Sequence, residues 1–281
     1  MGAAAACHAD FCQAHALGGE ARIVGGAVRD WLANYPVGDI DMAINLPIET
    51  VISHLLACDM RVVETGLKHG TITLYDNDDQ IELTQTRVDL ETDGRHAIVA
   101  HDQDWARDAA RRDFTINALY LGSSGSIFDP LGGKADLEAG RLRFAGDAGL
   151  RVQEDALRMF RYCRFLPRFA ATGIDPHAQT ALRKHASLCA GLSGERIANE
   201  MRRIMVGGGL KEVIGLMQDS KIDQAALSLS LDPSRLANDD EIGSMIAGLG
   251  ANIDLAWLVN LAVAMPSGSA ALLAKRLRLS R

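Results

Sequence analysis

Two aspartates one residue apart, Asp39 and Asp41, open the stretch DIDMAI that covers residues 39–44. The alternation of polar and apolar residues predicts a half-buried strand, in which alternate side chains share a face. The two carboxylates are therefore expected side by side, with Ile40 and Met42 directed into a core. Neighbouring carboxylates repel each other, and a divalent cation or a shared proton relieves the repulsion. The spacing therefore favours either a divalent-cation site or a shared proton at Asp39 and Asp41, unless the pair is simply a strand end that faces water.

A pair of glycines precedes these acids. Residues 23–32 read IVGGAVRDWL, a short apolar strand that breaks at Gly25 and Gly26 into a helical stretch containing Arg29. A helix start presents free backbone N–H groups and a positive dipole end, and glycine lets an anion come close to them. Either feature alone is common in turns and strand ends. A phosphate cradle followed closely by paired acids indicates phosphoryl transfer assisted by two metal ions.

The elements that follow are expected to build a sheet around this segment. We predict one helix at residues 48–56, three strands at 61–63, 71–75 and 80–86, and a hairpin turn at 76–79. Glu82 lies between Ile81 and Leu83, so its carboxylate is expected on the face opposite two apolar side chains. From the residues alone, Glu82 is either a catalytic acid or simply an exposed acid of a hairpin.

The next segment is polar and then basic. Residues 87–105 are expected to form an irregular loop, and a loop of this length is typically functional or mobile. Residues 111–119 read RRDFTINAL, with apolar residues at helical spacing that leave Arg112 and Asn117 free for other contacts. The guanidinium fork of Arg112 suits phosphate oxygens.

A basic helix is predicted over residues 151–166, RVQEDALRMFRYCRFL, with its apolar residues forming one buried stripe. Four charged residues recur at every third position and form a slanted ridge, namely Asp155, Arg158, Arg161 and Arg164. A solvated basic helix with an internal salt bridge would give the same pattern. Residues 141–205 carry twelve lysines and arginines against six acids, a local balance of +6 in a chain of net charge −7. A surface for phosphate or RNA backbone is therefore expected here.

Together these stretches resemble the signature of the class II tRNA nucleotidyltransferase (CCA-adding) and poly(A) polymerase family. The similar segments are residues 23–45, 87–105, RRDFTINAL at 111–119, EDALRMFRYCRF at 154–165 and SGERIANE at 193–200. The resemblance implies an α/β head of the nucleotidyltransferase fold, with a mixed sheet and helices, followed by an all-α neck and body. It divides the chain into a catalytic head at 1–140, a neck for base recognition and RNA contact at 141–205, and a body at 206–281 that is short beside its relatives.

The resemblance also implies roles for the candidate residues. Asp39 and Asp41 would hold Mg²⁺, and Glu82 would be a third catalytic carboxylate. The nucleotide would be bound by Gly26, Arg29, Arg112, Asp155, Arg158, Arg161 and Arg164. Residues 87–105 resemble the flexible loop that relatives use to switch from C to A addition, and SGERIANE would brace the base-reading helix.

Hydrogen-bond chemistry explains how Asp155 and Arg158 could select among the four bases. Cytosine N4 and adenine N6 are amino donors, whereas uracil O4 and guanine O6 are acceptors. A carboxylate at Asp155 pairs with the first two and repels the second two, and Arg158 supplies a donor to the adjacent ring nitrogen. The expected reaction adds C and A to the tRNA 3′ end from CTP and ATP and releases pyrophosphate. A poly(A) polymerase, a CC-only or A-only enzyme, and a catalytically silent RNA-binding relative remain open.

Composition limits the remaining possibilities. A chain of 281 residues with 48% hydrophobic and 5% aromatic residues predicts a mostly helical protein with more than one core. Its five scattered cysteines fit reduced thiols in the cytoplasm. The first residues lack the pattern of a secretory signal. The most apolar run also contains polar residues that would be costly to place in a membrane, so we expect no membrane partner. No obligate protein partner is evident.

Overall fold

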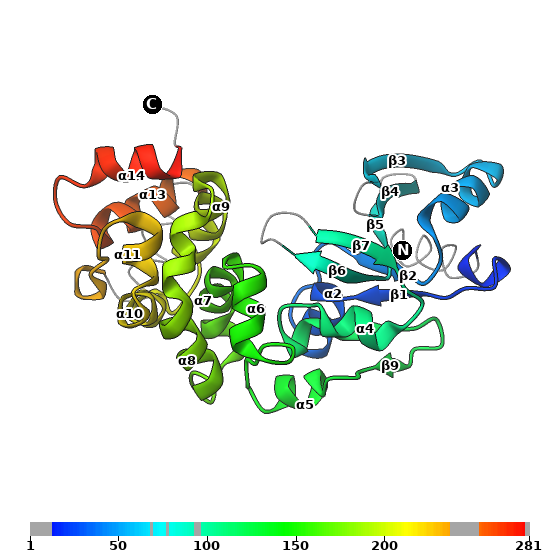
Figure 1. Ribbon diagram of the computed structural model, residues 1–281, viewed down its shortest axis with the longest axis horizontal. Coiled ribbons are helices and arrows are strands. Elements are labelled where there is room, and N and C mark those ends of the chain that lie inside the picture. The colour runs from blue at the N-terminus through cyan, green and yellow to red at the C-terminus, as the bar shows by residue number, and fades with distance from the viewer. Residues whose placement is uncertain (1–12, 68–69, 77–78, 93–96, 237–252, 279–281) are drawn as a thin grey trace. The chain divides into compact units, whose positions relative to one another are not determined.

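The computed structural model describes residues 13–67, 70–76, 79–92, 97–236 and 253–278 (Figure 1). The chain forms two compact units, one of residues 1–139 with 143–146 and one of residues 140–142 with 147–281. Within the described ranges, no helix has both the length and the apolarity to cross a membrane. The finer division into a neck at 141–205 and a body at 206–281 stays a prediction.

A seven-stranded mixed sheet organises the first unit, in the order β3-β4-β5-β2-β1-β8-β9. Its strands are β1 (Ala21–Val24), β2 (Asp41–Ile44), β3 (Arg61–Gly66), β4 (Thr71–Asp76), β5 (Asp79–Gln85), β8 (Tyr120–Leu121) and β9 (Ile127–Phe128). The pair β2 and β5 is parallel, and the other neighbours are antiparallel. The predicted strands at 61–63, 71–75 and 80–86 are thereby confirmed.

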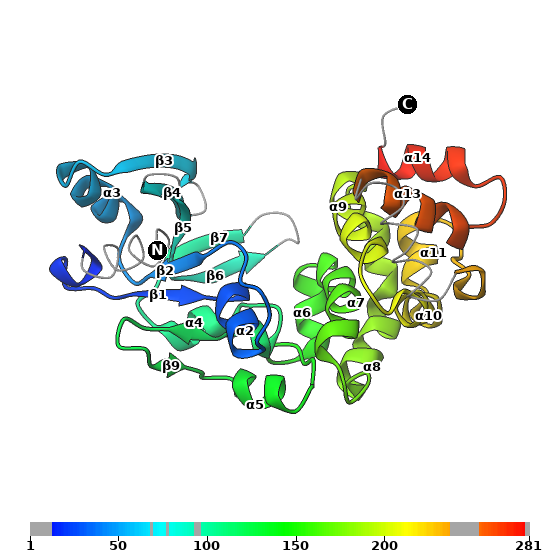
Figure 2. The same cartoon turned by 180° about the vertical axis from the view of Figure 1, so that it is seen from behind.

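Helices cover both faces of this sheet (Figures 1 and 2). Helix α3 (Ile48–Ala57) lies over the face formed by Met42, Ile81 and Leu83, and Ile40 packs at its edge, so the predicted alternation of these residues is confirmed. On the other face α4 (Trp105–Ala110) packs Trp105 and Ala109 against Val24, Ala43 and Tyr120. Two further helices of this unit are α2 (Gly26–Leu32) and α5 (Gly133–Glu138).

The predicted irregular loop at 87–105 is wrong. The chain there forms a separate antiparallel hairpin of β6 (Arg87–Thr92) and β7 (Ala97–His101), and Asp104 then caps α4. RVDLET alternates charged residues with Val, Leu and Thr, and AIVAH contains the β-branched pair Ile-Val, so both segments carry a strand pattern that outweighs their polar neighbours. Residues 93–96, between the two strands, lie outside the described residues.

The RRDFTINAL segment is buried but is not an α-helix. Phe114, Ala118 and Leu119 are all fully buried, as the spacing predicts. Phe114 forms an isolated antiparallel β-bridge with Phe144. Residues Thr115–Asn117 then make one 3₁₀ turn, and the chain enters β8 soon afterwards. The short distance to β8 leaves no room for a longer helix.

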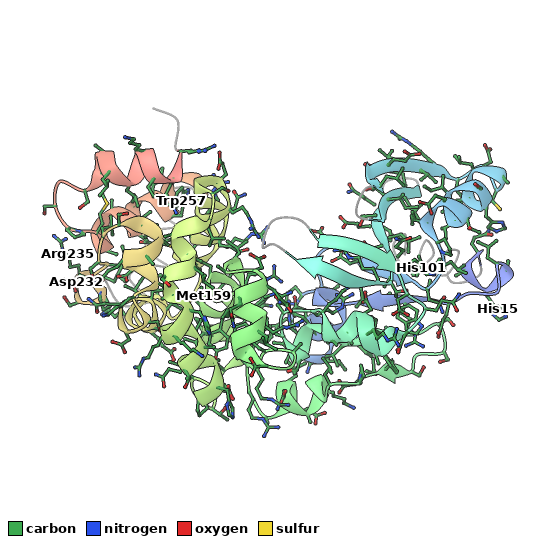
Figure 3. The ribbon with its side chains drawn as sticks, viewed as in Figure 1. His15, His101, Met159, Asp232, Arg235 and Trp257 are labelled. Atoms are coloured by element: carbon green, nitrogen blue, oxygen red, sulfur yellow. The ribbon has the colours of Figure 1, made fainter. Side chains whose placement is uncertain are left out.

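The second unit is helical (Figure 2). Its described helices are α6 (Ala148–Glu154), α7 (Leu157–Phe169), α8 (Pro176–His185), α9 (Gly194–Met205), α10 (Leu210–Ser220), α11 (Ile222–Leu227), α13 (Ile253–Ala264) and α14 (Ala270–Leu277). Met159 of α7 and Trp257 of α13, both labelled in Figure 3, are buried in this unit. The fold thus has an α/β head and an all-helical remainder, as expected.

The predicted single helix at 151–166 is broken at Asp155. This residue is extended, with φ −150° and ψ 106°, and its Oδ1 accepts a hydrogen bond of 3.0 Å from the Leu157 N–H. An aspartate side chain competes with the helical backbone and favours helix ends, which explains the break. The apolar stripe continues in α7, where Phe160, Cys163 and Leu166 are buried.

Candidate active site and base-reading residues

Two acids face each other across neighbouring strands of the head. Asp41 is the first residue of β2, and its Cα partner in the parallel strand β5 is Glu82. Both residues are exposed, on the face opposite the buried Met42, Ile81 and Leu83. Partners on adjacent strands have closely spaced side chains on one face of a sheet. The register therefore brings together two carboxylates that lie far apart in the sequence.

The strand begins two residues later than predicted, so alternation along β2 does not position Asp39. Asp39 is exposed and lies in a bend that follows Pro36 and Gly38. The carboxylate that strand geometry places beside Asp41 is that of Glu82. Asp39 nevertheless lies near enough to act on Asp41 electrostatically.

Burial, together with repulsion from the neighbouring acids, raises the pKa of Asp41. Burial of its carboxyl group raises the pKa, although the residue as a whole is open to solvent, and Glu82 and Asp39 raise the pKa further. Only the positive charge of Arg112, among the causes of the shift, opposes this change. The site therefore has an excess of negative charge that a cation would relieve.

Oxygen donors of this kind fit Mg²⁺, which takes carboxylates and water as ligands. As the described side chains stand, no group of three or more His, Cys, Asp or Glu residues is arranged to hold a metal ion. The fit therefore rests on two observations: the adjacency of Asp41 and Glu82, and the repulsion acting on Asp41.

A glycine turn lies directly beside the acids. Val24 at the end of β1 is the Cα partner of Asp41, and the chain then passes through Gly25 into α2. Gly25 has φ +73° and serves as the N-cap of α2 without a side-chain hydrogen bond. A Cβ atom at Gly25 would lie 3.6 Å from Nη1 of Arg112. The Gly25 N–H donates to the Leu119 carbonyl at 3.2 Å, so the N–H groups at the start of α2, from Gly26 onward, are the ones placed beside the acids and Arg112, an arrangement suited to an anion.

Arg112 is held in place by a buried acid that sequence reasoning missed. Asp108 of α4 is fully buried and accepts hydrogen bonds from Arg112 Nη2 at 3.1 Å and Tyr120 Oη at 2.7 Å. Arg112 Nε also donates to Tyr120 Oη at 3.0 Å, and Arg111 pairs with the other carboxylate oxygen of Asp108. The spacing of an acid three and four residues before two arginines, on one helical turn, is the signal that could have identified Asp108.

Electrostatics agrees with this role for Asp108. Its burial alone would raise the pKa of the carboxyl group, but Arg112, Arg111 and the Tyr120 hydroxyl outweigh burial and hold the pKa below its ordinary value. Asp108 is therefore ionised at neutral pH and fixes the guanidinium of Arg112 beside Gly25.

Asn117, which was expected to be free for other contacts, accepts a hydrogen bond from Arg29 of α2 instead. Arg29 is buried and donates from Nη1 to Asn117 Oδ1 at 2.6 Å and from Nε to Asp30 Oδ1 at 2.9 Å. Asn117 in turn donates from Nδ2 to Asp113 Oδ1 at 3.0 Å. This network ties α2 to the RRDFTINAL segment. Spacing along the chain gives no signal for a contact between residues so far apart.

In the helical unit, Asp155 and Arg158 have separate partners. Asp155 Oδ2 accepts from Arg196 Nη2 at 2.8 Å, whereas Arg158 Nη1 donates to Glu154 Oε2 at 2.6 Å and to the Arg151 carbonyl at 3.1 Å. A continuous helix would allow a salt bridge between Asp155 and Arg158. The break between α6 and α7 instead leaves each of the two side chains with a different partner. Both residues are half-buried.

The predicted bracing of this helix by SGERIANE is confirmed. Arg196 of α9 pairs with Asp155, and the buried Glu200 accepts from Arg164 Nε at 2.8 Å. Burial, followed by the neighbouring positive charges of Arg161 and Arg203, holds the pKa of Arg164 below its usual value. Arg161 lies with its guanidinium 5.9 Å from the ring centre of Phe165.

A mixed seven-stranded sheet that presents Asp41, Glu82 and a glycine turn, followed by helices, is the architecture of a nucleotidyltransferase head with a helical remainder. Residues 21–143 match the family model described as "Poly A polymerase head domain". Residues 173–227 match the one described as "Probable RNA and SrmB- binding site of polymerase A".

Named relatives agree with this class. The chain is 40% identical over 220 residues to the mitochondrial CCA tRNA nucleotidyltransferase 1 of Danio rerio, covering 73% of this chain and 51% of the relative. It is 36% identical over 207 residues to a CCA-adding enzyme of Geobacillus thermodenitrificans, covering 72% and 50%. The crystal structure of the Bacillus stearothermophilus CCA-adding enzyme with CTP superposes with a TM-score of 0.69 and 27% identity, over 89% of this chain and 65% of that chain.

The chain belongs to the tRNA nucleotidyltransferase and poly(A) polymerase family. It spans about half the length of the curated relatives that it matches.

Proposed function

We propose that the chain acts as a template-independent RNA nucleotidyltransferase. It adds C and A, as CCA, to the tRNA 3′ end from CTP and ATP, and pyrophosphate is released. The observation that carries this proposal is the pairing of Asp41 with Glu82 on parallel strands, directly beside the Gly25 turn. The names of the relatives, and the CTP bound to the Bacillus stearothermophilus enzyme, support the choice of substrates.

In the proposed reaction, the RNA 3′-hydroxyl attacks the α-phosphorus of the nucleotide. The backbone N–H of Gly26 at the start of α2, together with Arg112, binds the triphosphate and orients its α-phosphate, and Gly25 allows the close approach of the phosphate. Mg²⁺, held by Asp39 and Asp41 with Glu82 as a third acid, would make the hydroxyl a better nucleophile and neutralise charge on the departing pyrophosphate. Arg29 acts through its hydrogen bond to Asn117, which fixes α2 and so positions the glycine turn.

Base selection is proposed for Asp155 and Arg158. A carboxylate offers about four acceptor positions, and the Leu157 N–H and Arg196 occupy two of them at Asp155. The remaining positions can accept the amino group of cytosine or adenine. Arg158 would donate to the adjacent ring nitrogen, and Arg161 and Arg164 would contribute positive charge toward phosphate groups. This set would admit CTP and ATP and reject UTP and GTP.

A second candidate activity is poly(A) addition, because both matching family models are described by poly(A) polymerase. The two activities differ in their products. A tRNA that lacks its terminal CCA is incubated with CTP, with ATP and with both, and the 3′ ends are sequenced. We expect CC from CTP alone and CCA from both nucleotides. Long A tails from ATP alone would establish poly(A) addition instead.

We keep the cytoplasm as the proposed compartment. The relatives from Danio rerio and Homo sapiens are named as mitochondrial, so fractionation of the source cells is the test.

A further inference from the structure

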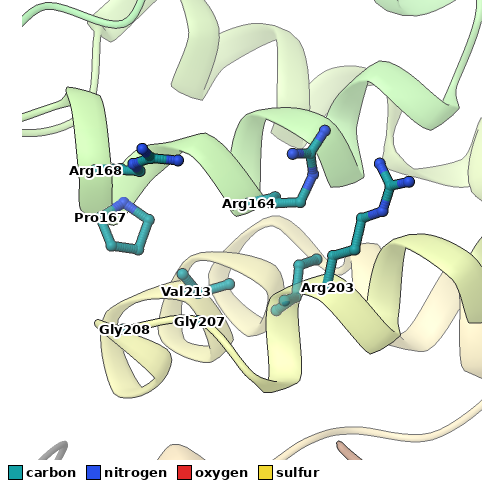
Figure 4. A pocket seen from close by; sticks show the side chains of 8 residues that line it. Arg164, Pro167, Arg168, Arg203, Gly207, Gly208 and Val213 are labelled. Carbon is teal, nitrogen blue, oxygen red and sulfur yellow. The ribbon is translucent and has the colours of Figure 1, made fainter. Parts of the chain in front are cut away.

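A pocket in the helical unit is lined by arginines and glycines from three helical elements (Figure 4). Its volume is about 170 Å³, and its lining residues are Arg164, Pro167, Arg168, Arg203, Ile204, Gly207, Gly208 and Val213. They come from α7, from the end of α9 with the turn after it, and from α10. Among the described residues, this lining contains three positive charges and no acid.

The positive charges of the pocket repel one another. Glu200, which does not line the pocket, pairs with Arg164 at 2.8 Å, and the lining itself holds three arginines and no acid. Arg203 lies close enough to Arg164 to lower its pKa, as does Arg161. Arg168 and Arg203 are exposed, so both guanidinium groups are accessible to a ligand. A bound anion would relieve this repulsion.

The shape of the pocket depends on its glycines. A Cβ atom at Gly209, the N-cap of α10, would approach Pro167 Cβ to 2.7 Å, so only glycine allows α10 to start this close to α7. Gly208 has open space at the position of a Cβ atom. The remaining wall is apolar and comes from Pro167, Ile204 and Val213. Arginine forks beside an apolar wall fit a phosphate that carries a sugar, as in a nucleic-acid backbone.

We infer that this pocket between α7, α9 and α10 binds a backbone phosphate of the RNA substrate, separately from the residues proposed to read the base. The inference rests on the proposed function, because an RNA must be bound for the subsite to act. The same chemistry could come from a free nucleotide, but a backbone phosphate is favoured. Arg168 and Arg203 line the pocket and are exposed, so an RNA strand that runs along the surface of the helical unit can reach both guanidinium groups.

The test compares two double variants that remove the same charge. Arg168→Gln/Arg203→Gln changes the pocket, and Arg235→Gln/Lys275→Gln changes two exposed residues of the same unit that lie outside residues 141–227 and do not line it. Binding of a tRNA without CCA is measured by fluorescence anisotropy over a range of salt concentrations. The loss of one phosphate contact should weaken binding roughly tenfold and reduce the slope of log K against log salt by about 0.9 in the pocket variant. The control variant Arg235→Gln/Lys275→Gln should bind nearly as the wild type does.

A third variant, Gly208→Asp, keeps every arginine and places an acid where a side chain meets no neighbour. It should also weaken RNA binding, and unchanged thermal unfolding would show that the fold is intact. Equal salt slopes in the wild type and in Arg168→Gln/Arg203→Gln would overturn the inference while leaving the proposed function standing. Weaker CTP binding with unchanged RNA binding would also overturn it, in favour of a free nucleotide. A wild-type chain that binds no tRNA would contradict the proposed function itself.

Discussion

Replacing Asp108 by asparagine tests how the proposed triphosphate site is held together. The Asp108 carboxylate is 1% exposed and accepts hydrogen bonds from Arg111, Arg112 and Tyr120 at 2.8, 3.1 and 2.7 Å. Asp108→Asn keeps the shape of the side chain but removes its charge, and it turns one acceptor into a donor that faces other donors. The loss of one partner of a buried ion pair costs about 3–5 kcal/mol. Arg111 and Arg112 are 20% exposed and regain some hydration, so we expect a loss of about 3 kcal/mol.

The assay is urea unfolding of the head, followed by the fluorescence of Trp105, whose ring packs edge-on against Tyr120 with centroids 5.5 Å apart. Glu138→Gln is the matched control, because it removes one negative charge from an exposed position of the same unit. We expect it to change the free energy of unfolding very little. Asp108→Asn should also raise the KM for CTP, because Arg112 loses the acid that positions it.

The pH dependence provides a second readout of the same variant. The pKa of Asp108 in the folded chain lies below its unfolded value, so its ionised form stabilises the head at every pH above the unfolded value. That stabilisation is lost as the pH falls through the folded pKa. The difference between wild type and Asp108→Asn should therefore be constant near neutral pH and shrink below about pH 4. A loss below about 1 kcal/mol, or a difference that does not change in acid, would refute the ion-pair explanation.

Three further perturbations address other parts of the account. Gly25→Ala forces a Cβ atom onto a backbone with φ +73°, which costs about 1–2 kcal/mol. The variant should raise the KM for CTP more than it lowers kcat. An unchanged KM would show that Gly25 is not part of the proposed triphosphate site. Asp155→Ala should lower the ratio of CTP to UTP incorporation, whereas Arg196→Gln, which removes only the brace, should retain most of the selectivity; equal ratios in Asp155→Ala and wild type would contradict base reading by this residue. Glu200→Gln removes the ion pair between Glu200 and Arg164 and should destabilise the helical unit by about 2 kcal/mol. Glu195→Gln changes an exposed acid and should leave the stability nearly unchanged. Equal urea midpoints for the two variants would show that the Glu200–Arg164 pair contributes little.

Local patterns in the sequence were sufficient for much of the head. Ile81 and Leu83 on either side of Glu82 identify the buried face of β5, because period-two burial is a local property of strands, and Met42 next to Asp41 does the same in β2. The pairing of Asp41 with Glu82 is not local. It depends on the parallel register of β2 and β5, and no spacing along the chain reports that register.

Long-range contacts account for the errors. Asn117 is expected to be free for other contacts, yet it pairs with Arg29 from a distant segment. Asp155 continues a helical pattern in RVQEDALRMFRYCRFL, but its side chain caps the Leu157 N–H and pairs with Arg196. In both cases a polar side chain finds a partner that only the folded chain supplies.

The central claim is that Asp41 lies at the centre of a metal-dependent nucleotidyl transfer. Its most direct test is the rate of CMP incorporation into a tRNA without CCA, measured in Mg²⁺ for the wild type, for Asp41→Asn and for the exposed control Glu49→Gln. We predict incorporation by the wild type and by Glu49→Gln, its loss when Mg²⁺ is chelated, and a fall of at least a thousandfold in Asp41→Asn, on the order of the electrostatic contribution of such groups. Incorporation by Asp41→Asn at the wild-type rate, or a wild-type rate that is unaffected by chelation, would contradict the account.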